Sequence, residues 1–348
     1  MLSLMVTTAV AAQRAPAVGP RGSTDSVDRF IRAEMARRHV PGVALAVVRS
    51  GRLVKAVGYG LADVEDDIPV TTQTVFKIGS VSKQFLASGV MLLAQDGKVN
   101  IDDPVEKYIA GTPETWRGIT LRHLLSHTSG ILREGPAFDP YKVQADSVVI
   151  QSAFAAALDF PTGSKWQYCN VCYFTLAEVI ARVSGKPWPA FMEERIFAPL
   201  AMTATRTTTT TDLVPHRAHG YAWRNNRYVN TEEYLALRPS GAFLSTVLDL
   251  AKWDMALEDG RVLTAATEEA MWTPIGLTGG ARYAYGFGWS LDSLGTHRQV
   301  HHGGALPGFR AEFARFPADH LTVIVLTNSD SGSPDELARG VAQIYLGR

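Results

Sequence analysis

The segment GSVSKQFLASGVMLLAQDG, residues 79–97, is typical of a buried helix that carries a lysine in its first turn. Apolar residues recur at helical spacing through the segment, and the pattern ends at Gly97. A lysine that faces a protein core is costly in free energy unless another group pairs with it or uses it. Lys83 therefore indicates that this helix carries chemistry as well as packing.

Ser80 lies three residues before Lys83, so both side chains would project from the same face of a helix. In the first turn, the Ser80 hydroxyl would lie near free backbone N–H groups and the positive end of the helix dipole. That environment suits attack on a carbonyl carbon, because the resulting oxyanion needs donors. Serine also needs a base, and a lysine acts as one only if its pKa falls from about 10.4 toward about 7 through desolvation or a neighbouring cation. The alternative is a capping serine and a surface lysine, because S-x-x-K is short and common by chance.

A second group of polar residues lies in KWQYCNVCYF, residues 165–174. In an extended or tightly turned chain, Tyr168 and Asn170 point the same way. A phenol facing Ser80 and Lys83 could carry a proton between the nucleophile and the leaving group, and the amide could bond both the lysine and a substrate amide. The alternative is an aromatic patch of the core with a structural asparagine.

A third group, in VHHGGALPGF at residues 300–309, follows a strand-like run. His302 could bind a substrate carboxylate or polarise the tyrosine. Gly303 and Gly304 would allow the backbone to approach a ligand closely. The alternative is a histidine that ends a strand before a glycine-rich turn.

The two ends of the chain predict one antiparallel sheet. A helix over 26–40 precedes two strands, Val43–Val48 and Leu53–Tyr59, which a short serine–glycine turn joins into a hairpin. An amphipathic helix over 334–347 closes the chain. Strand-like runs precede it at 285–292, 298–304, 308–317 and 321–329. Because no long helix separates these runs, we expect antiparallel pairing, with the terminal helices covering the sheet.

The middle of the chain is richer in helix signals. Besides the lysine-bearing segment, helices are predicted at 120–130, 170–185 and 245–260. The predicted fold class is therefore α/β (α+β): an antiparallel sheet flanked by terminal helices, with an inserted, mostly helical domain. We expect residues 27–75 and 281–348 to form the sheet domain, residues 76–280 to form the helical domain, and the active site to lie at their interface.

The composition argues against several functions. The 348 residues carry 34 Lys and Arg against 34 Asp and Glu, for a formal net charge of zero. There is no basic tract or aromatic-interleaved basic patch, so no nucleic-acid partner is expected. No apolar run reaches about 18 residues, so no membrane span is expected. A small-molecule substrate is the expected partner.

The N-terminal segment differs in character from the rest. Residues 1–13 are apolar, and Ala9-Val10-Ala11 resembles a small-x-small signal-peptidase site, although the basic n-region is missing. Residues 14–26 hold prolines and glycines that are typical of a flexible leader. We therefore interpret residues 1–26 as a signal-like segment and leader, and expect a periplasmic or secreted protein, with the cytoplasm as the alternative.

Two pairs of residues have spacings that occur in metal or redox sites. Cys169 and Cys172 form C-x-x-C, but neither a thioredoxin-like unit nor two further zinc ligands accompany them. We expect two small, semi-buried residues. His123 and His127 are four residues apart, but no glutamate follows the first histidine as in H-E-x-x-H, so structural hydrogen bonding is the expected role. We predict no metal and no cofactor.

Taken together, the motifs occur in an order that resembles the serine β-lactamase and penicillin-binding-protein family: Ser-x-x-Lys, then Tyr-x-Asn, then His-x-Gly. The chain is most similar to the class C β-lactamase, D-alanyl-D-alanine carboxypeptidase and β-lactamase-like esterase branch, where the second motif is Tyr-x-Asn. Other segments also resemble landmarks of this family: TLRHLLSHTSGI, FPTGSKWQYCN, IFAPLAMTAT and AFLSTVLDLAKW. The resemblance spans residues 27–345 and implies the β-lactamase/transpeptidase-like fold.

The resemblance implies a role for each motif residue. Ser80 would be the acylated nucleophile, and Lys83 and Tyr168 would share the work of the general base. The backbone N–H groups of Ser80 and Ala305 would form the oxyanion hole. Residues implied to bind substrate or to support the site are Asn170, His302, Gly303 and Gly304.

The third motif bears on the substrate. Class C β-lactamases carry lysine where this chain has His302, whereas His-x-Gly resembles D,D-peptidases and esterases. The implied function is a serine hydrolase that acts through an acyl-enzyme on Ser80 and cleaves ester or amide bonds, in small carboxylic esters or D-amino-acid peptides. The alternatives are a class C-like β-lactamase, a non-catalytic penicillin or peptidoglycan sensor, and an acyltransferase.

Overall fold

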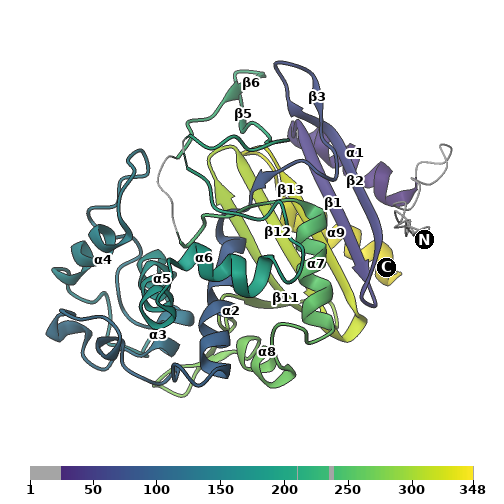
Figure 1. Ribbon diagram of the computed structural model, residues 1–348. Helices are drawn as coiled ribbons and strands as arrows, with labels where there is room; N and C mark the ends of the chain where they lie inside the picture. The colour runs from purple at the N-terminus through teal and green to yellow at the C-terminus, as the bar shows by residue number, and fades with distance from the viewer. Residues whose placement is uncertain (1–24, 210, 235–238, 348) are drawn as a thin grey trace, which may run out of the picture.

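The computed structural model describes residues 25–209, 211–234 and 239–347. A seven-stranded antiparallel sheet forms its centre, and helices cover both faces (Figure 1). The strand order is β10 (Ser290–Leu294), β11 (His297–Leu306), β12 (Phe309–Phe316), β13 (Leu321–Thr327), β1 (Gly42–Arg49), β2 (Arg52–Asp63) and β3 (Ile68–Pro69). The predicted antiparallel sheet is confirmed. The signal-like segment and the leader, predicted over residues 1–26, lie outside the described residues except for Asp25 and Ser26.

The side chains of the central strand β1 enter two cores, one on each face of the sheet. Its odd-numbered residues, from Val43 to Val47, belong to the core beneath α1 (Ser26–Arg38) and α9 (Pro334–Leu346). Its even-numbered residues belong to the larger core on the opposite face, where α7 (Val247–Glu258) packs (Figure 1). Because both faces are buried, the strand is apolar from Gly42 to Val48 and does not alternate with polar residues. The predicted cover of terminal helices is confirmed.

Most of the chain between β3 and β10 is helical or irregular and lies beside the sheet (Figure 1). Its helices are α2 (Ser82–Gln95), α3 (Leu121–Leu125), α4 (Asp146–Phe154), α5 (Asn170–Ser184), α6 (Trp188–Met192), α7 and α8 (Ala265–Met271). Its short strands pair as β4 (Phe76–Lys77) with β7 (Leu244–Ser245), β5 (Tyr221–Arg224) with β6 (Arg227–Asn230), and β8 (Ile275–Gly276) with β9 (Arg282–Tyr283). Helix α2 packs against α5, and all its residues from Ser82 to Leu93 are buried, including the polar Ser82, Lys83, Gln84 and Ser88. None of the described helices is long and apolar enough to span a membrane.

The N-terminal helix and hairpin form as predicted. The Asp25 side chain accepts a hydrogen bond from the Asp28 N–H and so caps α1, and the helix ends where His39 adopts a left-handed conformation with φ 54°. Between β1 and β2, Ser50 and Gly51 have φ of 50° and 68°. Two positive φ values suit the twist of a two-residue hairpin turn.

The strand predicted over 285–292 starts later, and this prediction was wrong at its beginning. Strand β10 begins only at Ser290. A Cβ on Gly286 would lie 1.9 Å from the backbone oxygen of Met271, so this part of the chain packs as a close loop against the end of α8. Glycines such as Gly286 allow this part of the chain to turn. The spacing of apolar residues alone does not distinguish such a loop from a strand.

The predicted domain boundaries, after residues 75 and 280, stay a prediction. The strands of the large sheet come from Gly42–Pro69 and Ser290–Thr327. Helix α7 falls inside the predicted helical part of the chain, yet it packs against β1 and β13. The two parts therefore share the core on that face of the sheet.

Candidate active site

Ser80 lies in a 3₁₀ turn, Gly79–Val81, that leads into α2. Gly79 has φ +52°, and a Cβ there would lie 2.7 Å from the backbone nitrogen of Ala305. Glycine is therefore required both by the left-handed backbone and by the close approach of β11. The turn presents a half-buried Ser80 to a cavity.

Lys83 is fully buried, with 0% of its surface exposed. Its Nζ lies 2.9 Å from Asn170 Oδ1, 2.7 Å from the backbone oxygen of Ser240 and 3.3 Å from Ser80 Oγ. These partners compensate for the loss of water around a buried amine. Ser240 was missed by sequence reasoning, because a backbone carbonyl acceptor carries no signal in the residue type.

Tyr168 and Asn170 flank Cys169, whose backbone is extended with φ −127° and ψ 106°. The Nζ of Lys83 lies 4.6 Å from the centroid of the Tyr168 ring. Tyr168 and Asn170 line the same cavity as Ser80. The structure thus brings the Ser-x-x-Lys and Tyr-x-Asn motifs together from distant parts of the chain.

Two charged residues that the sequence reasoning missed also line this cavity. The guanidinium carbon of Arg133 lies 5.3 Å from the centroid of the Tyr168 ring. Asn170 Nδ2 donates to Glu134 Oε1 at 2.5 Å, so its amide joins a carboxylate to Lys83. These contacts fix the orientation of the amide, with its oxygen toward the lysine. No motif contains Arg133 or Glu134, and only the packing of their loop beside α5 reveals them.

His302 is neutral and held within the protein. Burial, with a smaller contribution from Lys83, lowers the pKa of His302 from 6.5 to about 3. Its Nδ1 lies 2.6 Å from the backbone oxygen of Gly303, so this nitrogen carries the proton, and its Nε2 accepts from the Tyr285 hydroxyl at 3.0 Å. The His302 and Tyr168 ring centroids are 6.1 Å apart. His302 lines the cavity but is only 4% exposed.

A buried hydrogen-bonded series continues from Tyr285 to the second motif. His127 Nε2 donates to the Tyr285 hydroxyl at 3.2 Å, and His127 Nδ1 accepts from the Cys169 backbone N–H at 3.1 Å. Burial holds the pKa of His127 well below 6.5, so one tautomer satisfies both bonds. Tyr285 therefore links the His-x-Gly strand to the Tyr-x-Asn segment. It was missed because a tyrosine in an apolar run is equally typical of plain core packing.

His123 has partners inside the protein as well. Its Nδ1 lies 3.1 Å from the Thr120 backbone nitrogen and 3.0 Å from the Thr120 hydroxyl, in a capping box at the start of α3. Structural hydrogen bonding, the predicted role of His123 and His127, accounts for the contacts of both.

The third motif lies against the Ser80 turn. A Cβ on Gly304 would lie 1.9 Å from the backbone oxygen of Ile78 and 3.2 Å from the backbone nitrogen of Ser80. Glycine therefore lets β11 approach the turn. Gly303 and Ala305 line the same cavity. The assignment of the Ser80 and Ala305 N–H groups to an oxyanion hole stays a prediction, and the closeness of the two segments supports it.

The cavity has a volume of about 1470 Å³ and contains both signs of charge. Besides the motif residues, its charged lining includes Arg133, Glu134, Arg224, Glu232, Arg310 and Glu312. Aromatic side chains such as Trp166 and Tyr141 add apolar surface. The cavity therefore offers a substrate both apolar surface and charged or polar groups for directed contacts.

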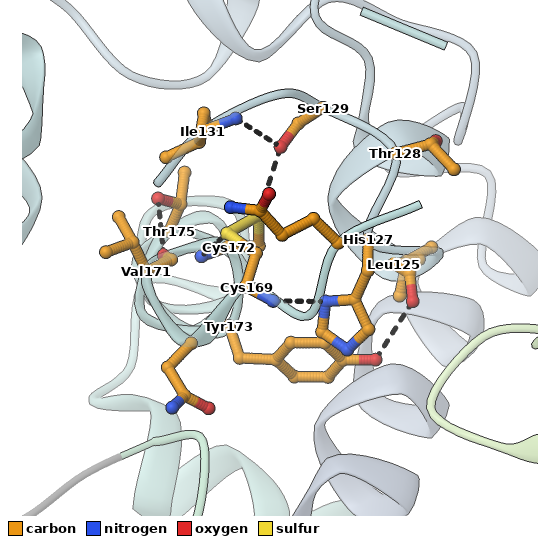
Figure 2. Close-up of a disulfide and its surroundings, with 12 residues drawn as sticks. Leu125, His127, Thr128, Ser129, Ile131, Cys169, Val171, Cys172, Tyr173 and Thr175 are labelled. Atoms are coloured by element: carbon orange, nitrogen blue, oxygen red, sulfur yellow. Dashed lines mark hydrogen bonds between the residues drawn. A yellow bond between two sulfur atoms is a disulfide. The ribbon is translucent and has the colours of Figure 1, made fainter. Parts of the chain in front are cut away.

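The two cysteines correct a prediction. They are 1% and 0% exposed and not semi-buried, and they form a disulfide (Figure 2). Cys169 is the N-cap of α5 and Cys172 lies in its first turn, with a Cα–Cα distance of 5.4 Å. That separation lies within the range a disulfide requires. The C-x-x-C spacing was interpreted as two small, semi-buried residues in preference to a thioredoxin-like or zinc site, and a disulfide between a helix cap and the first turn was not predicted.

Comparison with known sequences gives consistent matches over nearly the whole described chain. A family model described as Beta-lactamase matches residues 27–346. Penicillin-binding protein 4* of Bacillus subtilis (strain 168) is 28% identical over 325 residues, which is 87% of this chain and 72% of that protein.

Solved structures match as well. The octameric penicillin-binding protein homologue from Pyrococcus abyssi is 28% identical with a TM-score of 0.80, over 92% of this chain and 77% of that one. The D-amino acid amidase from Ochrobactrum anthropi SV3, solved with D-phenylalanine, is 26% identical with a TM-score of 0.81, over 93% of this chain and 100% of that one. The match over most of this chain fits the resemblance seen in the motifs.

Proposed function

The chain belongs to the beta-lactamase family, and from this premise we propose that it hydrolyses ester or amide bonds through an acyl-enzyme on Ser80. The observation that carries the proposal is the buried Lys83 amine, 3.3 Å from Ser80 Oγ and 2.9 Å from Asn170 Oδ1. A buried amine beside a half-buried serine hydroxyl, at the edge of a cavity, is the arrangement that an activated nucleophile needs.

The hydrogen bonds around Lys83 support a role as base. A neutral amine has two N–H groups and one lone pair. The two shorter contacts run to carbonyl oxygens, at Asn170 and Ser240, and can take the two N–H groups. The Ser80 hydroxyl, at 3.3 Å, can then donate to the lone pair. In the neutral state the amine is therefore oriented to accept the serine proton.

The reaction follows in two steps. As the Ser80 oxygen bonds to the substrate carbonyl carbon, its proton passes to Lys83 or Tyr168, and the oxyanion is stabilised by the backbone N–H groups of Ser80 and Ala305. The leaving alcohol or amine takes a proton as the bond to the carbonyl carbon breaks, which leaves the acyl group on Ser80. Water then attacks the carbonyl carbon of this ester and gives a proton to the same base. The bond to Ser80 Oγ breaks, Oγ takes that proton, and the carboxylic acid leaves.

The state of His302 supports substrates without a carboxylate near the third motif. Neutral histidine offers no positive charge, and both of its ring nitrogens are occupied by Gly303 and Tyr285. β-Lactams and free D-Ala-D-Ala peptides each carry such a carboxylate. We therefore rank small esters and D-amino-acid amides or blocked peptides above β-lactams. The D-amino acid amidase among the structural relatives adds support.

One substrate panel tests this proposal. p-Nitrophenyl butyrate, D-phenylalanine amide, a D-Ala-D-Ala peptide and a chromogenic cephalosporin are each assayed with the wild type and with Ser80→Ala. We expect the wild type to turn over the first two substrates and Ser80→Ala to turn over neither. Fast cephalosporin hydrolysis with no esterase or amidase activity would reverse the ranking. A Ser80 adduct that never turns over would identify a sensor, and ester products with an added alcohol would identify an acyltransferase.

We also propose that the protein works in the periplasm or outside the cell. The disulfide between Cys169 and Cys172 supports this, because disulfides persist mainly in oxidising compartments. The test is cell fractionation with thiol alkylation before lysis. Protein found in the cytoplasm with two free thiols would contradict the proposal.

A further inference from the structure

Cys169 lies between the two residues of the Tyr-x-Asn motif, and its sulfur is bonded to Cys172 in the first turn of α5 (Figure 2). The residue between Tyr168 and Asn170 is therefore covalently tied to the first turn of α5. Both sulfurs are buried behind the cavity wall, since neither cysteine lines the cavity. The link is close enough to the site to control its geometry, yet it touches no substrate.

The disulfide strengthens an ordinary helix cap. Cys169 Sγ accepts a hydrogen bond from the Cys172 backbone N–H at 3.0 Å, as a serine oxygen does at many N-caps. The covalent bond between the same two side chains prevents the extended cap residue from moving relative to the first turn of the helix. The angle at which the chain enters α5 is thereby fixed, and this angle sets the relation of Tyr168 to Asn170.

The capped segment is also held from the opposite side. The backbone N–H groups of Cys169 and Asn170 donate to His127 Nδ1 at 3.1 Å and to the Arg133 backbone oxygen at 2.8 Å. The Cys172 sulfur lies 3.2 Å from the Ser129 hydroxyl (Figure 2). The disulfide therefore lies between α5 and the 127–133 segment, and loss of it would loosen one of the two supports of the motif.

We propose that the Cys169–Cys172 disulfide is a positioning element of the active site: it holds Tyr168 and Asn170 against Lys83, so the enzyme is fully active only when these cysteines are oxidised. The proposal rests on the proposed hydrolase function for its readout. A disulfide that closes so short a loop removes little entropy from the unfolded chain, because that effect grows with loop length. Its effect is therefore expected on turnover more than on overall stability.

A dithiol reductant would open the disulfide by thiol–disulfide exchange. One thiolate of the dithiol attacks a cysteine sulfur and forms a mixed disulfide, and the second thiol then displaces the protein thiol. The protein gains two electrons and two protons, and the dithiol becomes a cyclic disulfide. Because both sulfurs are buried, reduction requires the start of α5 to open first.

The test compares two double variants with the wild type on p-nitrophenyl butyrate. C169A/C172A removes the disulfide and the cap acceptor, whereas C169S/C172A restores an oxygen acceptor without the covalent bond. We expect kcat to fall about tenfold in both variants, with KM changed less than about threefold, because a small misplacement of catalytic groups acts on the chemical step. We also expect a shifted acid limb in the pH profile of kcat/KM, which a merely structural disulfide would not move.

Two results would overturn the proposal. One is wild-type kcat in C169S/C172A, which would show that a hydrogen-bonded cap suffices. The other is an activity loss that only follows the unfolded fraction. If the variants do not fold, wild-type protein reduced with dithiothreitol in mild urea and diluted into buffer replaces them. Equal kcat before reduction and after it would again refute the proposal, whereas an inactive oxidised wild type would instead refute the hydrolase function.

Discussion

The Nζ atom of Lys83 lies 3.3 Å from Ser80 Oγ, and the same nitrogen lies 2.9 Å from Asn170 Oδ1. One buried amine thus contacts the first motif and the second at once. The relationship explains why a lysine is retained in a helix that is otherwise almost fully buried. It also defines how each substitution around the amine should act.

Replacing Lys83 by methionine removes the base and keeps the volume. We expect kcat/KM for an ester to fall about 10³-fold, because general-base catalysis contributes about 10²–10⁴. The free energy of unfolding should change by less than about 2 kcal/mol, because an apolar side chain of similar size removes the cost of burying an amine. Ester kinetics and urea unfolding measure the two quantities. Activity within tenfold of wild type would show that Lys83 is not the base.

Asn170→Asp places a carboxylate beside Lys83, in the position where the Asn170 amide now lies between Lys83 and Glu134. An adjacent anion raises the pKa of a lysine, so the neutral fraction of Lys83 falls at a given pH. We expect kcat/KM at neutral pH to drop about 100-fold and the acid limb of its pH profile to move to higher pH. Asn170→Ala is the matched control, which should lose activity without this alkaline shift. If the acid limb of Asn170→Asp does not shift, residue 170 does not influence the pKa of Lys83, and the expected coupling is contradicted.

Gly304→Ala tests the approach of β11 to the nucleophile turn. Its Cβ would lie 1.9 Å from the backbone oxygen of Ile78, so the strand must move away from Ser80. We expect a loss of acylation of about 100-fold or more, because a displacement of about 1 Å is enough for that effect. Gly279→Ala is the control, since its Cβ meets nothing within 4 Å. A fluorophosphonate labelling rate compares the two, and equal rates would contradict the expected crowding.

The buried histidines predict a dependence of stability on pH. Burial lowers the pKa of His302 from 6.5 to about 3, so between these values the unfolded chain binds a proton that the folded protein does not. The stabilising contribution of neutral His302 is therefore complete above about pH 6.5 and is lost as the pH falls toward about 3. Urea unfolding at about pH 7.5 and about pH 4.5 measures the change, and His302→Gln should show a smaller loss. The same loss in both proteins would assign the effect to other groups.

Much of the fold was predictable because its signals are local. The turn at Ser50 and Gly51, the apolar strand that follows His39, and the amphipathic C-terminal helix each depend on a few neighbouring residues. The strand predicted over 285–292 failed at its start for a tertiary reason, since Gly286 packs closely against Met271. No local pattern reports that contact.

The site residues also fall into those that the sequence predicted and those that only the folded chain reveals. Residue type and order predicted that Ser80, Lys83, Tyr168 and Asn170 share one site, and the structure brings the four residues together, while their catalytic roles stay a prediction. Glu134, Tyr285 and the Ser240 carbonyl were missed because each acts through one contact made only in the folded chain. The disulfide shows the same limit: its C-x-x-C spacing is visible in the sequence, but its position as a helix cap follows only from the fold.

Trapping the covalent intermediate tests the central claim most directly. An ester substrate is mixed with the enzyme, quenched in acid within one turnover, and the digested protein is examined by mass spectrometry. We predict one added acyl group on the wild-type peptide that contains Ser80, and none on that peptide in Ser80→Ala. Turnover without any acyl group on that peptide, or the same adduct in Ser80→Ala, would contradict the account.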